Sequence, residues 1–232
     1  SGFKITLPLL RRALAALTYG DLLMLLRNQT RPYEKNPGET DALVDKWVDD
    51  ICARFLKGKG FQKKQIRTLT REIVASFDRI EILPVKKIRV GIVGEIYAKY
   101  SPLANNHLED FLRSQDCEVN VPGIMAFMLF KVDNRLEDIK LYGGNPLKKF
   151  VIQILYDYLE VFERYTLDAV SISARYHKPA SYRAIKQMVR PLIGYGCKMG
   201  EGWLLTGEMI ELVETGRRIT GGRTVVKVRA VD

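Results

Sequence analysis

Two segments of the chain concentrate side chains that could contact a ligand or a cofactor. The first, GIVGEIYAKYSPLANN, covers residues 91–106 and begins at the end of a β-branched run. In open α/β sheets ligands bind beyond the carboxyl ends of the strands, and this segment is longer than a plain strand-to-helix connection. We interpret it as a loop that contacts a ligand or a partner, with an ordered surface loop as the alternative. Its candidate residues are Glu95, Tyr97, Lys99, Tyr100, Asn105 and Asn106.

The second segment is GCKMGEGWLL, residues 196–205. Small residues around Cys197 let the backbone approach a bulky group closely, as a cluster or a cofactor would require. Glu201 suits the start of a helix, where a carboxylate is favoured. Composition alone favours a glycine-rich helix entry with an incidental cysteine, and a cluster neighbour at Cys197 is the alternative.

The other reactive residue types are few. Cys52 and Cys117 are far apart, no CxxC occurs, and the only histidines are His107 and His177. This pattern argues against a disulfide framework and against a self-contained zinc site. We expect reduced cysteines, a helix-capping neighbour at His107 and a structural or exposed His177. The glycines of the first segment are spaced GxxG, so the GxGxxG dinucleotide fingerprint is absent.

The net charge of +10 is unevenly distributed. Residues 1–87 carry 17 Lys and Arg and 10 Asp and Glu, residues 88–215 carry 15 and 16, and residues 216–232 carry 5 and 1. The excess therefore lies in the front and in the tail. Because no nucleic-acid-reading element accompanies it, we expect a solvated basic face and no nucleic-acid binding.

Hydrophobic periodicity locates the elements that position both segments. Residues 1–84 predict four helices: one from Leu7 that is interrupted at Thr18–Asp21, a short one that ends before Arg31, a third that Gly58 stops, and a fourth over 61–80. Thr18 or Asp21 is the expected N-cap of the second helix. From residue 85 the pattern predicts strands over 88–94 and 117–121 and helices over 108–112, 124–130, 147–165, 180–193 and 203–214.

The expected fold is therefore α/β and helix-rich: a Rossmann-like unit with a small, mainly parallel sheet, joined to an N-terminal helical region. We expect three parts: a helical region over 1–84, the Rossmann-like domain over 85–216 and an atypical basic tail over 217–232. No apolar run approaches the roughly 18 residues that a membrane-spanning helix needs. No signal peptide is recognisable, so a cytoplasmic protein without membrane contact is expected.

Several stretches together resemble the 2-hydroxyacyl-CoA dehydratase family, in the branch described as CoA-substrate-specific activase or dehydratase-activator related. They are RPYEKNPGETD, KIRVGIVGEIYAKYSPLANNHLEDFLRSQDCEVNVPG, LYGG and GYGCKMGEGWLLTGEMIELVETG. The resemblance implies Rossmann-like domains around cysteine-held [4Fe–4S] clusters, an ATP-dependent activase or dehydratase subunit as partner, and acyl-CoA as ligand. It also implies anaerobic ketyl-radical removal of water, a lyase reaction, from substrates such as 2-hydroxyglutaryl-CoA. It places the Glu95–Asn106 loop at the cluster or substrate edge.

The end of the chain departs from the family. There, an ending like this one leads into an apolar strand and a cysteine-bearing segment, whereas here Gly216 is followed by RRITGGRTVVKVRAVD. We expect a truncated product or fragment whose own cluster is absent, with Thr224–Val231 as a strand at the vacant sheet edge.

Two functions follow as hypotheses. The first is a fragment or subunit of 2-hydroxyacyl-CoA dehydratase-type chemistry, or of its activator, that is inactive alone. The alternative is a non-catalytic interaction module that docks through the basic helical front.

Overall fold

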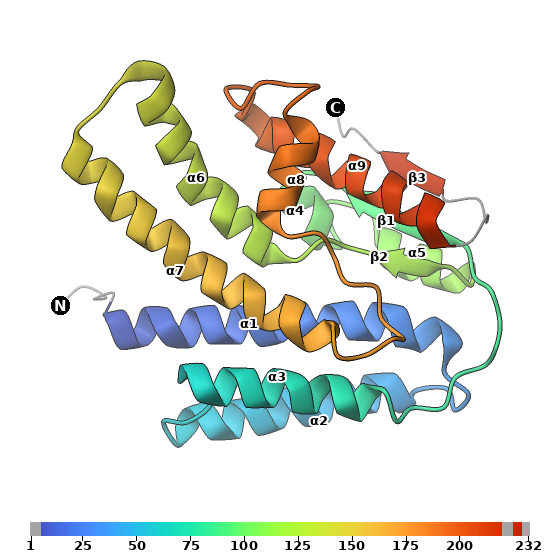
Figure 1. Cartoon of the computed structure of the whole chain (residues 1–232). Coiled ribbons are helices and arrows are strands. Elements are labelled where there is room, and N and C mark those ends of the chain that lie inside the picture. The colour runs from blue at the N-terminus through green and yellow to red at the C-terminus, as the bar shows by residue number, and fades with distance from the viewer. Residues whose placement is uncertain (1–5, 220–224, 229–232) are drawn as a thin grey trace. The chain divides into compact units, whose positions relative to one another are not determined.

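The computed structural model describes residues 6–219 and 225–228 and shows a helix-rich α/β fold (Figure 1). Its packing divides the chain into two compact units. The front unit comprises residues 1–84 and 161–178, and the sheet unit comprises residues 85–160 and 179–232. Residues 161–178, which the sequence places in the α/β domain, therefore cluster with the helical front. One long helix, α7, belongs to both units: its first part is in the sheet unit and its second part is in the front unit.

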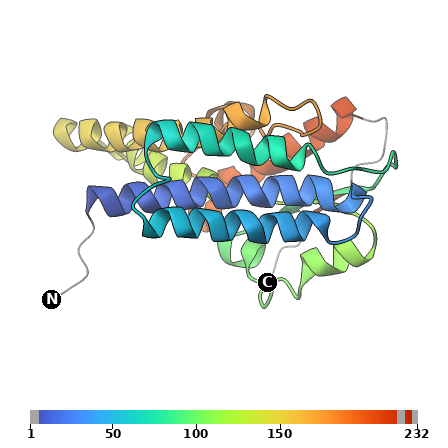
Figure 2. The ribbon, with the colours of Figure 1, turned by 90° about the horizontal axis from the view of Figure 1, so that it is seen from below.

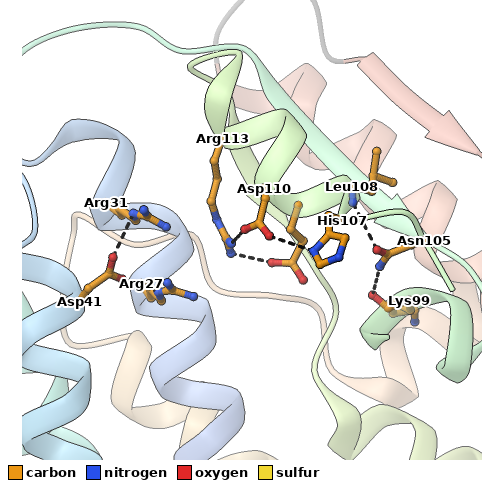
Figure 3. Close-up of polar contacts among 10 residues, drawn as sticks. Arg27, Arg31, Asp41, Lys99, Asn105, His107, Leu108, Asp110 and Arg113 are labelled. Carbon is orange, nitrogen blue, oxygen red and sulfur yellow. Dashed lines mark hydrogen bonds and ion pairs between the residues drawn. The ribbon is translucent and has the colours of Figure 1, made fainter. Parts of the chain in front are cut away.

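The front unit is helical. Its elements are α1 (Leu7–Thr30), the 3₁₀ turn η1 (Arg31–Tyr33), α2 (Glu39–Leu56), α3 (Lys63–Phe77) and the second part of α7 (Pro146–Val170). Helices α1, α2 and α3 run side by side and pack on one another (Figure 2). The core side chains are fully or almost fully buried: Tyr19, Leu22, Leu26, Ile66, Ile73 and Phe77. Asp41 ties α2 to α1 and η1, because it lies 2.6 Å from Arg27 and 3.2 Å from Arg31 (Figure 3).

The predicted interruption at Thr18–Asp21 is wrong, because α1 continues through it as one helix. The Thr18 hydroxyl donates to the Leu14 carbonyl at 2.9 Å, so it is satisfied inside the helix and caps nothing. Thr18 is fully buried and Asp21 nearly so. Burial of this face overrides the local break signal, since helical stability in proteins comes mainly from tertiary packing.

The sheet unit contains a small parallel sheet, as the sequence predicts. Strand β1 (Arg89–Val93) lies between β2 (Glu118–Asn120) and β3 (Val225–Val228), and Val90 pairs with Val119 on one side and Val225 on the other. The described part of the predicted tail strand is thus confirmed, and its remaining residues lie outside those described. The helical elements are α4 (Ile96–Tyr100), α5 (Leu108–Ser114), α6 (Ile124–Tyr142), α8 (Tyr182–Val189), η2 (Met199–Glu201) and α9 (Gly202–Ile219).

Two element predictions need correction in this unit. The segment 95–106, expected as a loop, contains the short helix α4. Helix α6 runs on to Tyr142 rather than ending near Phe130. Its polar residues Asp133 and Glu137 are buried, so its later turns do not show the apolar stripe from which a buried helix is recognised.

Close approaches at two glycines bring α9 against its neighbours. A Cβ atom at Gly91 on β1 would collide with the end of the Leu212 side chain, and one at Gly207 would collide with Ile185 on α8. Helix α9 therefore packs on both β1 and α8. This packing carries the second sequence segment to the strand that the first segment follows.

A buried polar network joins α6 to α8. Lys186 lies 2.6 Å from an Asp133 oxygen and 2.7 Å from a Glu137 oxygen, and the Tyr182 hydroxyl donates to Asp133 at 2.8 Å. Burial opposes the ionisation of Glu137, but hydrogen bonds from Lys140 and Lys186 prevail and lower its pKa. Burial, reinforced by Asp133, raises the pKa of Tyr182. The network fixes α8, on which α9 rests.

None of the helices described here is both long and apolar enough to pass through a bilayer.

Candidate functional site

A buried ion pair in the sheet unit joins the first sequence segment to α9, the helix that the second segment enters. Lys99 on α4 donates to both carboxylate oxygens of Glu208 on α9, at 2.8 and 2.7 Å. The Lys99 side chain is 4% exposed and that of Glu208 is 1% exposed. A buried charge is tolerated only when its partner compensates it. Each residue of this pair therefore needs the other, and the pair holds α4 against α9.

A second contact aligns the start of α4 with the start of α9. One Glu201 oxygen accepts a hydrogen bond from the Ile96 backbone amide at 2.9 Å. Glu201 is buried, and its carboxylate lies where a helix N-terminus favours negative charge. Gly200 lies against the Glu95 carboxylate, with no room for a Cβ atom between them. The GEIY and GEGW stretches therefore form one structural unit.

Burial dominates the electrostatics of the ion pair. It raises the pKa of Glu208 above the ordinary 4.5, while Lys99 opposes the rise and the Glu201 carboxylate adds to it. A carboxyl group in this setting is easier to protonate than one in water. The pair is closed, because Lys99 and Glu208 are bound to each other and hidden from solvent.

Several predicted ligand residues are instead bound to the chain itself. The Tyr100 hydroxyl donates to the Pro122 carbonyl. Asn105 accepts from the Leu108 amide at 3.2 Å and donates to the Lys99 carbonyl at 3.3 Å, so it links α4 to the start of α5 (Figure 3). Lys99, Tyr100 and Asn105 therefore hold the conformation of the segment through contacts within the chain.

The side chains that a ligand could reach are Glu95, Tyr97 and Asn106. All three are exposed, and Tyr97 is 64% exposed. The set offers a carboxylate, a phenol and an amide directly beyond the carboxyl end of β1, where ligands bind in α/β sheets.

Backbone strain gathers in the same two segments. Four non-glycine residues with positive φ occur in the described part of the chain, and three of them are Asn106, His107 and Glu201. Gly200 is also left-handed. Such conformations persist where the surroundings impose them, and they cluster at functional sites. The observation supports a site here rather than a plain connection.

The cysteines do not gather around a metal. Cys197 is exposed at the η2 end of the site, Cys117 is buried and Cys52 lies in the front unit. Over residues 6–219 and 225–228, no group of three or more His, Cys, Asp or Glu residues is arranged to hold a metal ion. Cys197 thus borders the site and belongs to no such group among the described residues.

The histidines take no part in the site. His107 is exposed and lies 3.5 Å from Asp110, which also pairs with Arg113 in the last turn of α5 (Figure 3). It is the N-cap residue of α5, but Asn105 supplies the side-chain hydrogen bond. His177 is held through its backbone by Gln29 in the front unit.

Sequence reasoning missed Glu208 altogether and took Glu201 only as a favourable helix start. A signal was present: the two acidic residues are seven positions apart, which is two turns of the predicted apolar helix 203–214 and its entry. Acidic residues repeated on a face that packs inward require buried partners. The partner, Lys99, is 109 residues away and no local pattern identifies it.

Comparison with known proteins adds no identification: neither a family model, nor a curated protein, nor a solved structure matches this chain.

Proposed function

We propose that this chain is a cytoplasmic component related to 2-hydroxyacyl-CoA dehydratases or their activators, with a Rossmann-like sheet unit. It works with an ATP-dependent activase or a dehydratase subunit and is inactive alone. The observation that carries the proposal is the meeting of the two segments that bear the resemblance. Lys99 binds Glu208, and Glu201 binds the start of α4, while Glu95, Tyr97 and Asn106 of the same segment are exposed.

The residues present do not fit a [4Fe–4S] cluster of this chain's own. Such a cluster needs about four thiolates. The chain has three cysteines, one of them in the other unit and one buried. In this proposal the cluster belongs to the assembled enzyme, and Cys197 contributes at most one ligand to it.

An acyl-CoA titration tests the proposal. We expect 2-hydroxyglutaryl-CoA to bind the full chain in anaerobic calorimetry, and Tyr97→Ala to weaken binding about tenfold, because a ring that packs on a ligand contributes of the order of 1–2 kcal/mol. Phe111→Ala is the matched control, since Phe111 is 57% exposed but lies on α5. No dehydration is expected from the chain alone.

Two results would count against this reading. Formation of enoyl-CoA by the purified chain would show that it needs no partner. If neither Tyr97→Ala nor Phe111→Ala changed the affinity for 2-hydroxyglutaryl-CoA, the ligand would bind elsewhere on the chain.

A second candidate function, a non-catalytic interaction module, is favoured by an apolar stripe on the first part of α7. Five large side chains there are 38–69% exposed. They recur at helical spacing, so they form one continuous face: Leu147, Phe150, Val151, Ile154 and Leu155. Docking through the basic helical front remains a prediction, whereas this exposed surface lies in the sheet unit.

We take a second copy of this chain as the partner, because its own stripe is an apolar face of matching length. An antiparallel pairing about a two-fold axis sets Val151 at the level of the second copy's Ile154 and Phe150 at the level of its Leu155, so the two stripes cover each other. Lys148 and Asp157 are exposed on opposite edges of the stripe, outside this contact.

A further inference from the structure

An open pocket in the front unit lies between the first turns of α3 and the second part of α7. Its volume is about 450 Å³, within the range of small-molecule sites. Seven residues line it, three from α3 and four from α7: Lys63, Lys64, Arg67, Val161, Arg164, Tyr165 and Asp168.

The pocket is strongly cationic. Four of its lining residues are Lys or Arg, and Asp168 is the single carboxylate among the seven. Within the described ranges, none of the four cationic side chains has a hydrogen bond or an ion pair. Other arginines of the chain are paired: Arg27 with Asp41 and Arg113 with Glu109. Four cations beside one carboxylate leave an excess of positive charge, so an anion in the pocket would relieve the repulsion among them.

The position of the two lysines adds to the positive charge of the pocket. Lys63 and Lys64 are in the first turn of α3, and that turn holds no acidic residue. The N-terminal end of a helix carries partial positive charge and favours anions, so two lysines there raise the local potential further. The capping box of Gln62 and Gln65 already satisfies part of this helix end. The pocket therefore lacks negative charge to balance its cations, rather than hydrogen-bond partners for the helix end.

We propose that this pocket binds a small molecule that carries two or more phosphate groups. Cations from two helices approach the space from different sides, which suits several anionic groups better than a single one. Val161 and Tyr165 add an apolar wall for the uncharged part of the ligand. A nucleic-acid backbone is a poorer fit, because the cations line a bounded pocket instead of an extended stripe. This inference is independent of the dehydratase proposal.

Calorimetric titration of the full chain with inorganic diphosphate tests the site. We expect saturable binding with one ligand per chain, and weaker binding of monophosphate. Arg67→Glu and Arg164→Glu should each lower the affinity about 10- to 100-fold, as expected when one charge-assisted contact to a phosphate is lost. Arg71→Glu makes the same change in net charge one turn further along α3, outside the pocket, and should lower affinity less than about threefold.

Titration with ADP and with CoA separates the possible sources of the phosphates. Binding of ADP or CoA more tightly than diphosphate would assign a nucleotide-type ligand, and equal binding would assign the phosphates alone. Circular dichroism of each variant confirms that the helices are retained. Absence of binding by all of these probes would overturn the proposal. So would an equal loss in Arg71→Glu, or displacement of diphosphate by single-stranded DNA with a steep salt dependence. Loss of acyl-CoA binding in Tyr97→Ala but not in Arg164→Glu would distinguish this site from the one in the sheet unit.

Discussion

Replacement of Lys99 by Met is expected to lower the free energy of unfolding by about 3–5 kcal/mol, the usual effect of breaking a buried ion pair. Methionine retains the length and the apolar stem of lysine but leaves the Glu208 carboxylate, 1% exposed, without its partner. Urea unfolding followed by circular dichroism measures the loss. The double variant K99M/E208Q removes both charges and should recover most of the stability, so the loss in K99M is assigned to the stranded charge.

The loss should depend on pH in a defined direction. Burial raises the folded-state pKa of Glu208 above 4.5. For such a group the stabilising contribution is fully present below the unfolded-state pKa and is lost as the pH rises through the folded-state pKa. Removal of Lys99 raises the pKa of Glu208 further, because Lys99 opposes the rise. The gap between K99M and the parent chain should therefore be smaller in mild acid than at neutral pH.

An exposed pair provides the matched control. Lys35 lies 2.7 Å from Glu81, but these side chains are 58% and 67% exposed. Lys35→Met should leave the unfolding curve unchanged, since exposed ion pairs contribute little. A K99M variant as stable as K35M at neutral pH would contradict the structural role of the buried pair.

Replacement of Ile154 by Asp is expected to convert a self-associating chain into a monomer. Val151 and Ile154 lie at the centre of the proposed antiparallel contact, and each change is repeated by the two-fold axis. A carboxylate there would be buried without a partner, so the dissociation constant should rise about 100-fold or more. Analytical ultracentrifugation over a range of concentrations measures this change. Leu192→Asp is the control, because Leu192 is 68% exposed outside the stripe.

A parent chain that stays monomeric at every concentration would overturn self-association, and so would an unchanged dissociation constant in Ile154→Asp.

Much of the sheet unit could be predicted from the chain alone. The β-branched run before Gly94 is typical of a buried parallel strand, and β1 lies there with parallel partners on both sides. The helical front was recognisable from its apolar periodicity. The break at Thr18–Asp21 was misjudged because the hydroxyl of Thr18 finds its partner within the helix, an outcome that depends on burial by α2 and α3.

The candidate site was predictable in position but not in detail. The segment leaves β1 after Val93 as expected, yet Lys99, Tyr100 and Asn105 are turned to partners within the chain. The direction of each side chain depends on a residue brought near by the fold: Glu208 for Lys99 and Pro122 for Tyr100. Local composition carries no information about such partners. Glu95, Tyr97 and Asn106 are exposed, and their contact with a ligand stays a prediction.

Anaerobic reconstitution with iron and sulfide tests most directly whether this chain depends on partners for its chemistry. Iron is counted and a visible spectrum recorded for the parent chain and for Cys197→Ser. Three dispersed thiols are expected to hold no stoichiometric cluster, so both proteins should be colourless, with well under one iron per chain. About four irons per chain with brown colour, lost in Cys197→Ser, would contradict this account and make the chain an iron–sulfur subunit in its own right.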